Sequence, residues 1–153
     1  MTHATKLLTA CAAVMLVASA SAMADDTEGT AEQARAMLLR AVAAIQADES
    51  RALAAFNAGE AGFKDHDLYV FCAGRDGVVD AHIDPAQRGR NMRDIYDLLG
   101  VAFGREMMAV AREGEIVAVS YMWPRPVSKV PVHKVTFVTR TADQMCGVGY
   151  YAP

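Results

Sequence analysis

Residues 116–151 read IVAVSYMWPRPVSKVPVHKVTFVTRTADQMCGVGYY, and this stretch decides the fold class. From Ile116 to Trp123, β-branched and aromatic residues alternate with smaller or polar ones, a pattern typical of a strand with one buried face. A second run covers Val130–Arg140 and a third covers Met145–Tyr151. Only short turns separate the three runs, so neighbouring strands are predicted to be antiparallel.

A further hairpin is predicted upstream of this stretch. Leu68–Cys72 is aromatic and β-branched, and Gly74–Gly77 contains an Asp-Gly turn signal. Val78–His82 returns as the partner strand. The next segment, Ile83–Asn91, contains a proline and a glycine and is predicted to be a loop.

Three helices complete the predicted order. Thr30-Ala31-Glu32-Gln33 is a capping box, and apolar residues recur after it at helical spacing up to Ile45. A shorter helix is expected over Arg51–Phe56, and a third from about Val101 to Arg112. The order α-α-β-β-α-β-β-β predicts an α+β domain in which an antiparallel sheet packs against helices.

The first 24 residues have the pattern of a secretory signal peptide. Lys6 is their one charged residue, an apolar stretch follows, and small residues before Ala24 form an A-x-A cleavage site. The apolar stretch is too short to span a bilayer. We therefore expect export, with cleavage at about Ala24, to the periplasm or the medium. The exported chain, residues 25–153, fits one domain with no membrane insertion.

Composition and motifs narrow the function classes. The formal net charge is −3 and the basic residues are dispersed, so nucleic-acid binding is not expected. The sequence contains no Gly-x-Ser-x-Gly elbow, His-Glu-x-x-His motif or Walker loop, and therefore predicts no catalytic residue, metal or cofactor. Asp65-His66-Asp67 is interpreted as a polar turn, because three consecutive residues converge poorly on one ion.

Two cysteines, Cys72 and Cys146, remain after cleavage, since Cys11 lies in the leader. An even pair in an exported protein favours a disulfide. Each cysteine could instead be a small buried apolar residue.

An ordered series of residues between Phe56 and Tyr151 resembles the single Cache domain family. It comprises Phe63, Asp67-Leu68-Tyr69-Val70-Phe71, Asp76-Gly77, Ala81-His82, Gly89, Asn91, Asp94, Phe103, Arg105-Glu106-Met107, Tyr121-Met122-Trp123-Pro124-Arg125-Pro126, Lys134, Phe137-Val138 and Gly147-Val148-Gly149-Tyr150. The resemblance implies a PAS-like fold with a five-stranded antiparallel sheet, a long N-terminal helix, a helix between strands 2 and 3, and a ligand pocket. In that fold the first and last strands are neighbours, which would bring Cys72 and Cys146 together.

The resemblance also implies extracytoplasmic sensing of small molecules, frequently small carboxylates. Lys134 is the expected positive anchor, since it matches the family's lysine after the Trp-Pro motif, although a lysine on a wet strand face is the alternative. His82 is a second candidate donor, or a structural histidine. Tyr121 and Trp123 share one strand face and could either line a pocket or fill a core.

Two further residues belong to the expected ligand-binding set. Tyr69 is the aromatic candidate on the first strand, where Phe71 is assigned to the core. Arg105 could pair with a carboxylate, or lie on a solvated helix face. Signal output would then require a partner: a membrane receptor, a histidine kinase or a second copy in a homodimer. The competing hypothesis is a structural or interaction module whose pocket is vestigial.

Overall fold

The computed structural model describes residues 28–125 and 128–152. The predicted signal peptide, its cleavage site, and Pro126 of the Trp-Pro motif lie outside these residues. Within the described ranges, no helix combines the length and apolar character needed to cross a bilayer.

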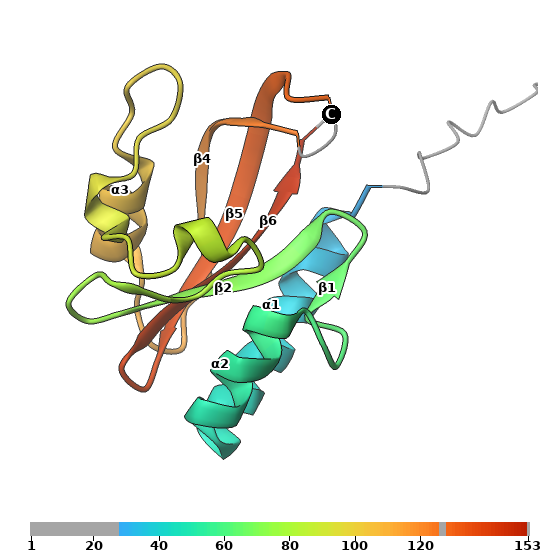
Figure 1. Ribbon diagram of the computed structural model, residues 1–153, viewed down its shortest axis with the longest axis vertical. Helices are drawn as coiled ribbons and strands as arrows, with labels where there is room; N and C mark the ends of the chain where they lie inside the picture. The colour runs from blue at the N-terminus through green and yellow to red at the C-terminus, as the bar shows by residue number, and fades with distance from the viewer. Residues whose placement is uncertain (1–27, 126–127, 153) are drawn as a thin grey trace, which may run out of the picture.

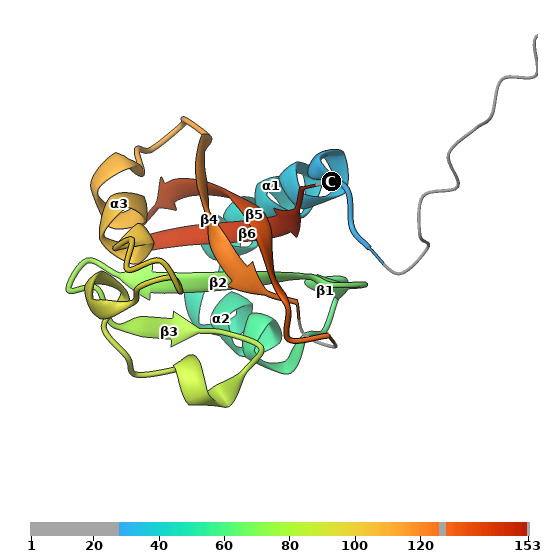
Figure 2. The same ribbon diagram turned by 90° about the horizontal axis from the view of Figure 1, so that it is seen from above.

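An antiparallel sheet forms the centre of the fold, and its strand order is β1-β2-β6-β5-β4, with β3 also paired to β2. The strands are β1 (Lys64–Asp65), β2 (Leu68–Gly74), β3 (Val79–Ala81), β4 (Val117–Pro124), β5 (Pro131–Thr141) and β6 (Gln144–Tyr151). Figure 2 shows β6 between β2 and β5. The first long strand is therefore a neighbour of the last, as the resemblance implies.

The strand count is six rather than the expected five. The extra strand, β1, has two residues and pairs with the start of β2, on the edge that β3 occupies further along. His66, with φ 54°, makes the turn between β1 and β2. The sequence gives no strand signal here because both residues of β1 are exposed and polar.

Two helices, α1 (Ala31–Ala47) and α2 (Glu49–Ala58), cover one face of the sheet (Figure 1). The capping box of α1 is confirmed: Thr30 Oγ1 accepts from Gln33 N at 3.2 Å, and Thr30 N donates to Gln33 Oε1 at 2.7 Å. Helix α2 begins before the predicted Arg51, because the Asp48 side chain caps it. Apolar side chains of both helices pack on alternate residues of β2 and β6.

The opposite face of the sheet is covered by shorter elements. These are the 3₁₀ helices η1 (Pro85–Gln87) and η2 (Met92–Asp94), and the helix α3 (Phe103–Val110). The loop predicted over 83–91 therefore contains one helical turn. Helix α3 is shorter than predicted, since no side chain caps it at Ala102 and Ala111 is already extended.

The disulfide between Cys72 and Cys146 is confirmed. The two residues are directly opposite one another on β2 and β6, with a Cα–Cα distance of 4.1 Å. Both side chains are fully buried under α1 and α2. The bond joins positions 74 residues apart in the sequence.

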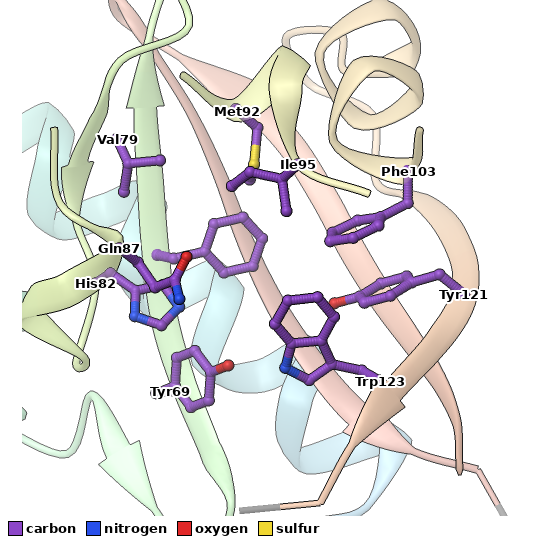
Figure 3. A pocket seen from close by; sticks show the side chains of 10 residues that line it. Tyr69, Val79, His82, Gln87, Met92, Ile95, Phe103, Tyr121 and Trp123 are labelled. Carbon is purple, nitrogen blue, oxygen red and sulfur yellow. The ribbon is translucent and has the colours of Figure 1, made fainter. Parts of the chain in front are cut away.

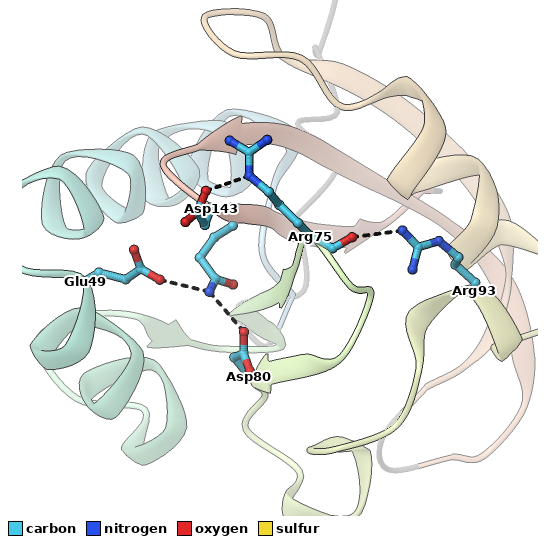
Figure 4. Close-up of polar contacts among 6 residues, drawn as sticks. Glu49, Arg75, Asp80, Arg93 and Asp143 are labelled. Carbon is cyan, nitrogen blue, oxygen red and sulfur yellow. Dashed lines mark hydrogen bonds and ion pairs between the residues drawn. The ribbon is translucent and has the colours of Figure 1, made fainter.

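Polar contacts connect the β2–β3 and β5–β6 turns to each other, and connect the start of β6 to α2 and β3 (Figure 4). Gln144 Nε2 donates to Glu49 Oε1 and to Asp80 Oδ2, at 3.0 Å each, and so links β6 to α2 and β3. Arg75 Nε donates to Asp143 Oδ1 at 2.6 Å, which joins the two hairpin turns. These contacts fix the hairpin from which the pocket residues of β2 and β3 extend.

Candidate functional site

A hollow lies between the sheet and the short elements that cover its second face (Figure 3). It holds about 420 Å³ of space outside the atoms, part of it open to solvent. It is lined by Tyr69, Phe71, Val79, His82, Gln87, Met92, Ile95, Phe103, Tyr121 and Trp123. Phe71, assigned to the core from the sequence, is buried and also lines the hollow.

Strand β4 supplies an aromatic wall to this hollow. Tyr121 and Trp123 point to the same side because alternate residues of a strand share a face. The Tyr121 ring stacks on Phe103 of α3, with centroids 3.9 Å apart, and Trp123 meets Phe103 edge to face at 5.4 Å. The Tyr121 hydroxyl shares a hydrogen bond of 3.0 Å with Thr136 Oγ1, and burial raises the pKa of Tyr121. Tyr121 is therefore a fixed wall residue, whereas Trp123 is only half-buried.

Lys134 lies on the same face of the sheet, next to the hollow. Its side chain is 2% exposed, so the alternative of a lysine on a wet strand face is wrong. Nζ lies 3.4 Å from the Tyr69 hydroxyl, 4.8 Å from the Tyr69 ring centroid and 4.6 Å from the Tyr151 ring centroid. Because Tyr69 lines the hollow, Lys134 contacts a wall residue without lining the hollow itself.

The sequence around Lys134 makes room for this arrangement. Gly149 faces it from β6, and a Cβ atom at Gly149 would lie 2.6 Å from Lys134 Cε. Tyr151, the residue opposite Lys134 on β6, is held in place because its hydroxyl donates to Pro124 O at 2.9 Å. The lysine stem thus crosses a glycine and ends between two tyrosine rings.

The charge of Lys134 is poorly compensated. Burial lowers the pKa of Lys134, and the nearby Tyr151 and Asp67 oppose that shift. None of the ion pairs formed within residues 28–125 and 128–152 involves Lys134. The ring faces and a hydroxyl are its close partners, although a buried cation is normally paired with an anion.

The Tyr69 hydroxyl is the polar group that connects Lys134 to the hollow. Burial raises the pKa of Tyr69 to about 12, and the carboxylates of Asp84 and Asp67 add to the shift. The hydroxyl is therefore protonated at neutral pH and can donate a hydrogen bond into the hollow. Figure 3 shows it on the side of the hollow facing Trp123.

His82 directly follows β3 and lines the same hollow. Asp84 N donates to His82 Nδ1 at 3.0 Å, and His82 N donates to Asn57 Oδ1 at 3.0 Å. Burial lowers the pKa of His82 to about 4, so the ring is neutral at neutral pH. Because Nδ1 accepts, the proton is assigned to Nε2, which makes His82 a hydrogen-bond donor rather than a cation.

Two of the expected ligand residues, Lys134 and Arg105, are not among the residues that line the hollow. Arg105 is exposed on α3, where Nη2 lies 3.5 Å from the Tyr96 hydroxyl. Conversely, Gln87, Met92 and Ile95 line the hollow but were not predicted from the sequence. The Asp84-Pro85 start of η1 was a usable signal for Gln87, since an N-cap residue before a proline favours a helical turn.

The antiparallel sheet, with helices on one face and an aromatic hollow on the other, defines an α+β domain. The chain belongs to the Cache domain family, whose model matches residues 25–150. Cache domains are extracytoplasmic, non-enzymatic sensor domains that bind small molecules. None of the curated proteins matches the chain.

The solved structures that are similar to the chain include the following three. A methyl-accepting chemotaxis protein from Vibrio parahaemolyticus is 21% identical with a TM-score of 0.63, and the match covers 78% of this chain and 86% of that one. The periplasmic sensor domain of a chemotaxis protein is 25% identical, with a TM-score of 0.60 and coverages of 80% and 90%. A Cache chemosensory domain, described for its carboxylic acid recognition, is 22% identical, with a TM-score of 0.60 and coverages of 80% and 88%.

Proposed function

We propose that this protein is a periplasmic sensor domain that binds a small carboxylate in the hollow of Figure 3. The observation that carries the proposal is Lys134, a buried lysine that forms no ion pair within residues 28–125 and 128–152 and contacts Tyr69, a residue of the aromatic hollow. A ligand carboxylate would supply the missing negative charge. The recognition of carboxylic acids by one structural neighbour supports this ligand class.

The polar groups of the hollow define how the ligand would be held. The Tyr69 hydroxyl and His82 Nε2 act as donors to the carboxylate, with Lys134 providing the positive charge behind Tyr69. The Trp123 indole N–H is a further donor from the opposite wall. The other end of the hollow is apolar, with Met92, Ile95 and Phe103 in its lining. A short aliphatic chain would fill that end.

Residues 25–153 would act as a single exported domain after cleavage at about Ala24. We propose a membrane receptor, a histidine kinase or a second copy of the chain as its partner in signalling. The competing function is an interaction module with a vestigial pocket. The hollow beside Trp123 supports the binding proposal, whereas the space around Lys134 is filled by Tyr69 and Tyr151.

A thermal-shift screen tests this proposal. The protein is titrated with two- to five-carbon carboxylic acids and with the primary amide of each acid, which has the same shape without the charge. We expect at least one acid to raise the melting temperature while its amide does not. Lys134→Met should abolish the shift, whereas Arg105→Ala should retain it, because Arg105 lies outside the hollow. Equal shifts from acid and amide, or none from any acid, would overturn the proposal.

A further inference from the structure

The loop that joins η2 to α3 presents apolar side chains to solvent. Leu98 is 64% exposed and Leu99 is 76% exposed, with Tyr96 and Val101 also exposed beside them. The loop protrudes next to α3 (Figure 1). Its backbone nevertheless closes on itself, since Asp97 N donates to Val101 O at 3.0 Å and Gly100 N donates to Asp97 O at 3.1 Å. It is therefore an ordered apolar surface.

The side chain of Asp97 is buried beneath this loop, at 7% exposure. Its Oδ1 accepts from Leu99 N and from Val101 N, each at 2.8 Å. Its Oδ2 accepts from Met122 N on β4 at 3.1 Å. Burial disfavours the charge, but these N–H groups outweigh it and hold the pKa of Asp97 below its usual range. Both carboxylate oxygens are thus used, one for the loop and one for the strand.

The two segments that Asp97 joins, the loop and β4, each adjoin residues that line the hollow. Met122 lies between Tyr121 and Trp123, whose side chains form the aromatic wall. The loop itself runs between Ile95 and Phe103, which also line the hollow. The loop is thus joined to the hollow through the chain at both of its ends and through the Asp97 carboxylate at its middle.

We propose that Asp97 is a positioning residue that couples the loop Tyr96–Val101 to the hollow, so that a change in the hollow alters the apolar surface. A ligand that moves Trp123 or Phe103 shifts Met122 N or the end of the loop, and Asp97 transmits the shift. Coupling of this kind is reciprocal, so a change at Asp97 alters the environment of Trp123. The inference rests on the proposed function for what fills the hollow, but its test uses no ligand.

The substitution Asp97→Asn is expected to keep the hydrogen bonds from Asp97 to the loop and to break the one to Met122 N on β4. The amide retains one oxygen, which can still accept from Leu99 N and Val101 N. Its NH₂ group then faces Met122 N–H, where two donors meet and no hydrogen bond forms. The matched control is Asp94→Asn, which removes the same charge from an exposed position in η2.

The experiment compares the purified wild-type protein with Asp97→Asn and Asp94→Asn. Amide hydrogen exchange is followed by NMR at Leu99, Val101 and Met122. Trp123 is the single tryptophan of the chain, so its emission and its quenching by acrylamide report on the hollow alone. For Asp97→Asn we expect about tenfold faster exchange at Met122, a changed Trp123 quenching constant, and exchange close to wild type at Leu99 and Val101. Asp94→Asn should match the wild type throughout.

Faster exchange at Met122 with unchanged Trp123 quenching would overturn the coupling, as would equal effects from Asp94→Asn. If Asp97→Asn does not fold, Trp123→Phe tests the reverse direction in the wild-type background. That variant should change exchange at Leu99 and Val101 while leaving helix α1 unchanged. Unchanged exchange in the loop would contradict the inference. Neither result depends on carboxylate binding, so the proposed function can fail separately.

Discussion

Reducing the bond between Cys72 and Cys146 should lower stability by an amount that the sequence separation sets. The bond closes a loop across 74 positions. In the chain-entropy treatment, opening such a loop destabilises the folded state by about 4.5 kcal/mol at 25 °C. For a domain of this size, that corresponds to a fall in melting temperature of about 15 °C. Both cysteines are fully buried, and reduction removes no heavy atom, so it leaves no cavity.

The assay is urea unfolding of the oxidised protein and of protein reduced in denaturant and refolded with reductant present. The reduced protein should unfold at lower urea concentration and with a larger m-value, since its unfolded chain is less compact. The double variant Cys72→Ala/Cys146→Ala should not respond to reductant, which controls for effects of the reductant itself. A reduced protein within about 1 kcal/mol of the oxidised one would refute this reasoning.

Two further predictions concern residues beside the hollow. Because the pKa of His82 is about 4 in the folded protein, against about 6.5 when unfolded, stability should fall as the pH decreases from about 6.5 to 4, by up to about 3 kcal/mol. Urea unfolding across this range checks it, and His82→Asn, which keeps an acceptor for Asp84 N, should show a flatter profile; an identical slope in both proteins would contradict the assignment. Gly149→Ala should lower the free energy of unfolding by about 1–3 kcal/mol, since the added Cβ would lie 2.6 Å from Lys134 Cε and still closer to Thr136 Oγ1. Thermal unfolding measures this, and wild-type stability in that variant would contradict the tight packing of these two side chains on Gly149.

Much of the architecture could be predicted from local patterns. The capping box at Thr30, the hairpin after Leu68 and the alternation in β4 each depend on neighbouring residues, and all three form as predicted. By contrast, β1 has no apolar pattern because it consists of two exposed polar residues. Both boundaries of α3 also differ from the prediction. No capping side chain marks its start at Ala102, and Ala111 gives no signal for its end.

The site was harder to predict than the fold, since it depends on what covers the second face of the sheet. Lys134 lies on the same strand face as Thr136 and Val138, because the three are alternate residues. This alternation alone does not tell whether the face is exposed to solvent or covered by other elements. The face is covered by η2 and α3, which come from residues 92–110, more than 20 residues away from Lys134 in the sequence. Asp97 gives no local signal either, because one of its acceptor oxygens is used by Met122, 25 residues away.

The central claim is that the charge of Lys134 is completed by the carboxylate of a ligand. Isothermal titration calorimetry of wild-type protein and Lys134→Met, each with the best acid from the screen and with its amide, measures this as a coupling free energy. We predict that Lys134→Met weakens acid binding by about 1.5–3 kcal/mol more than amide binding. An acid that binds Lys134→Met as tightly as wild type would contradict the claim.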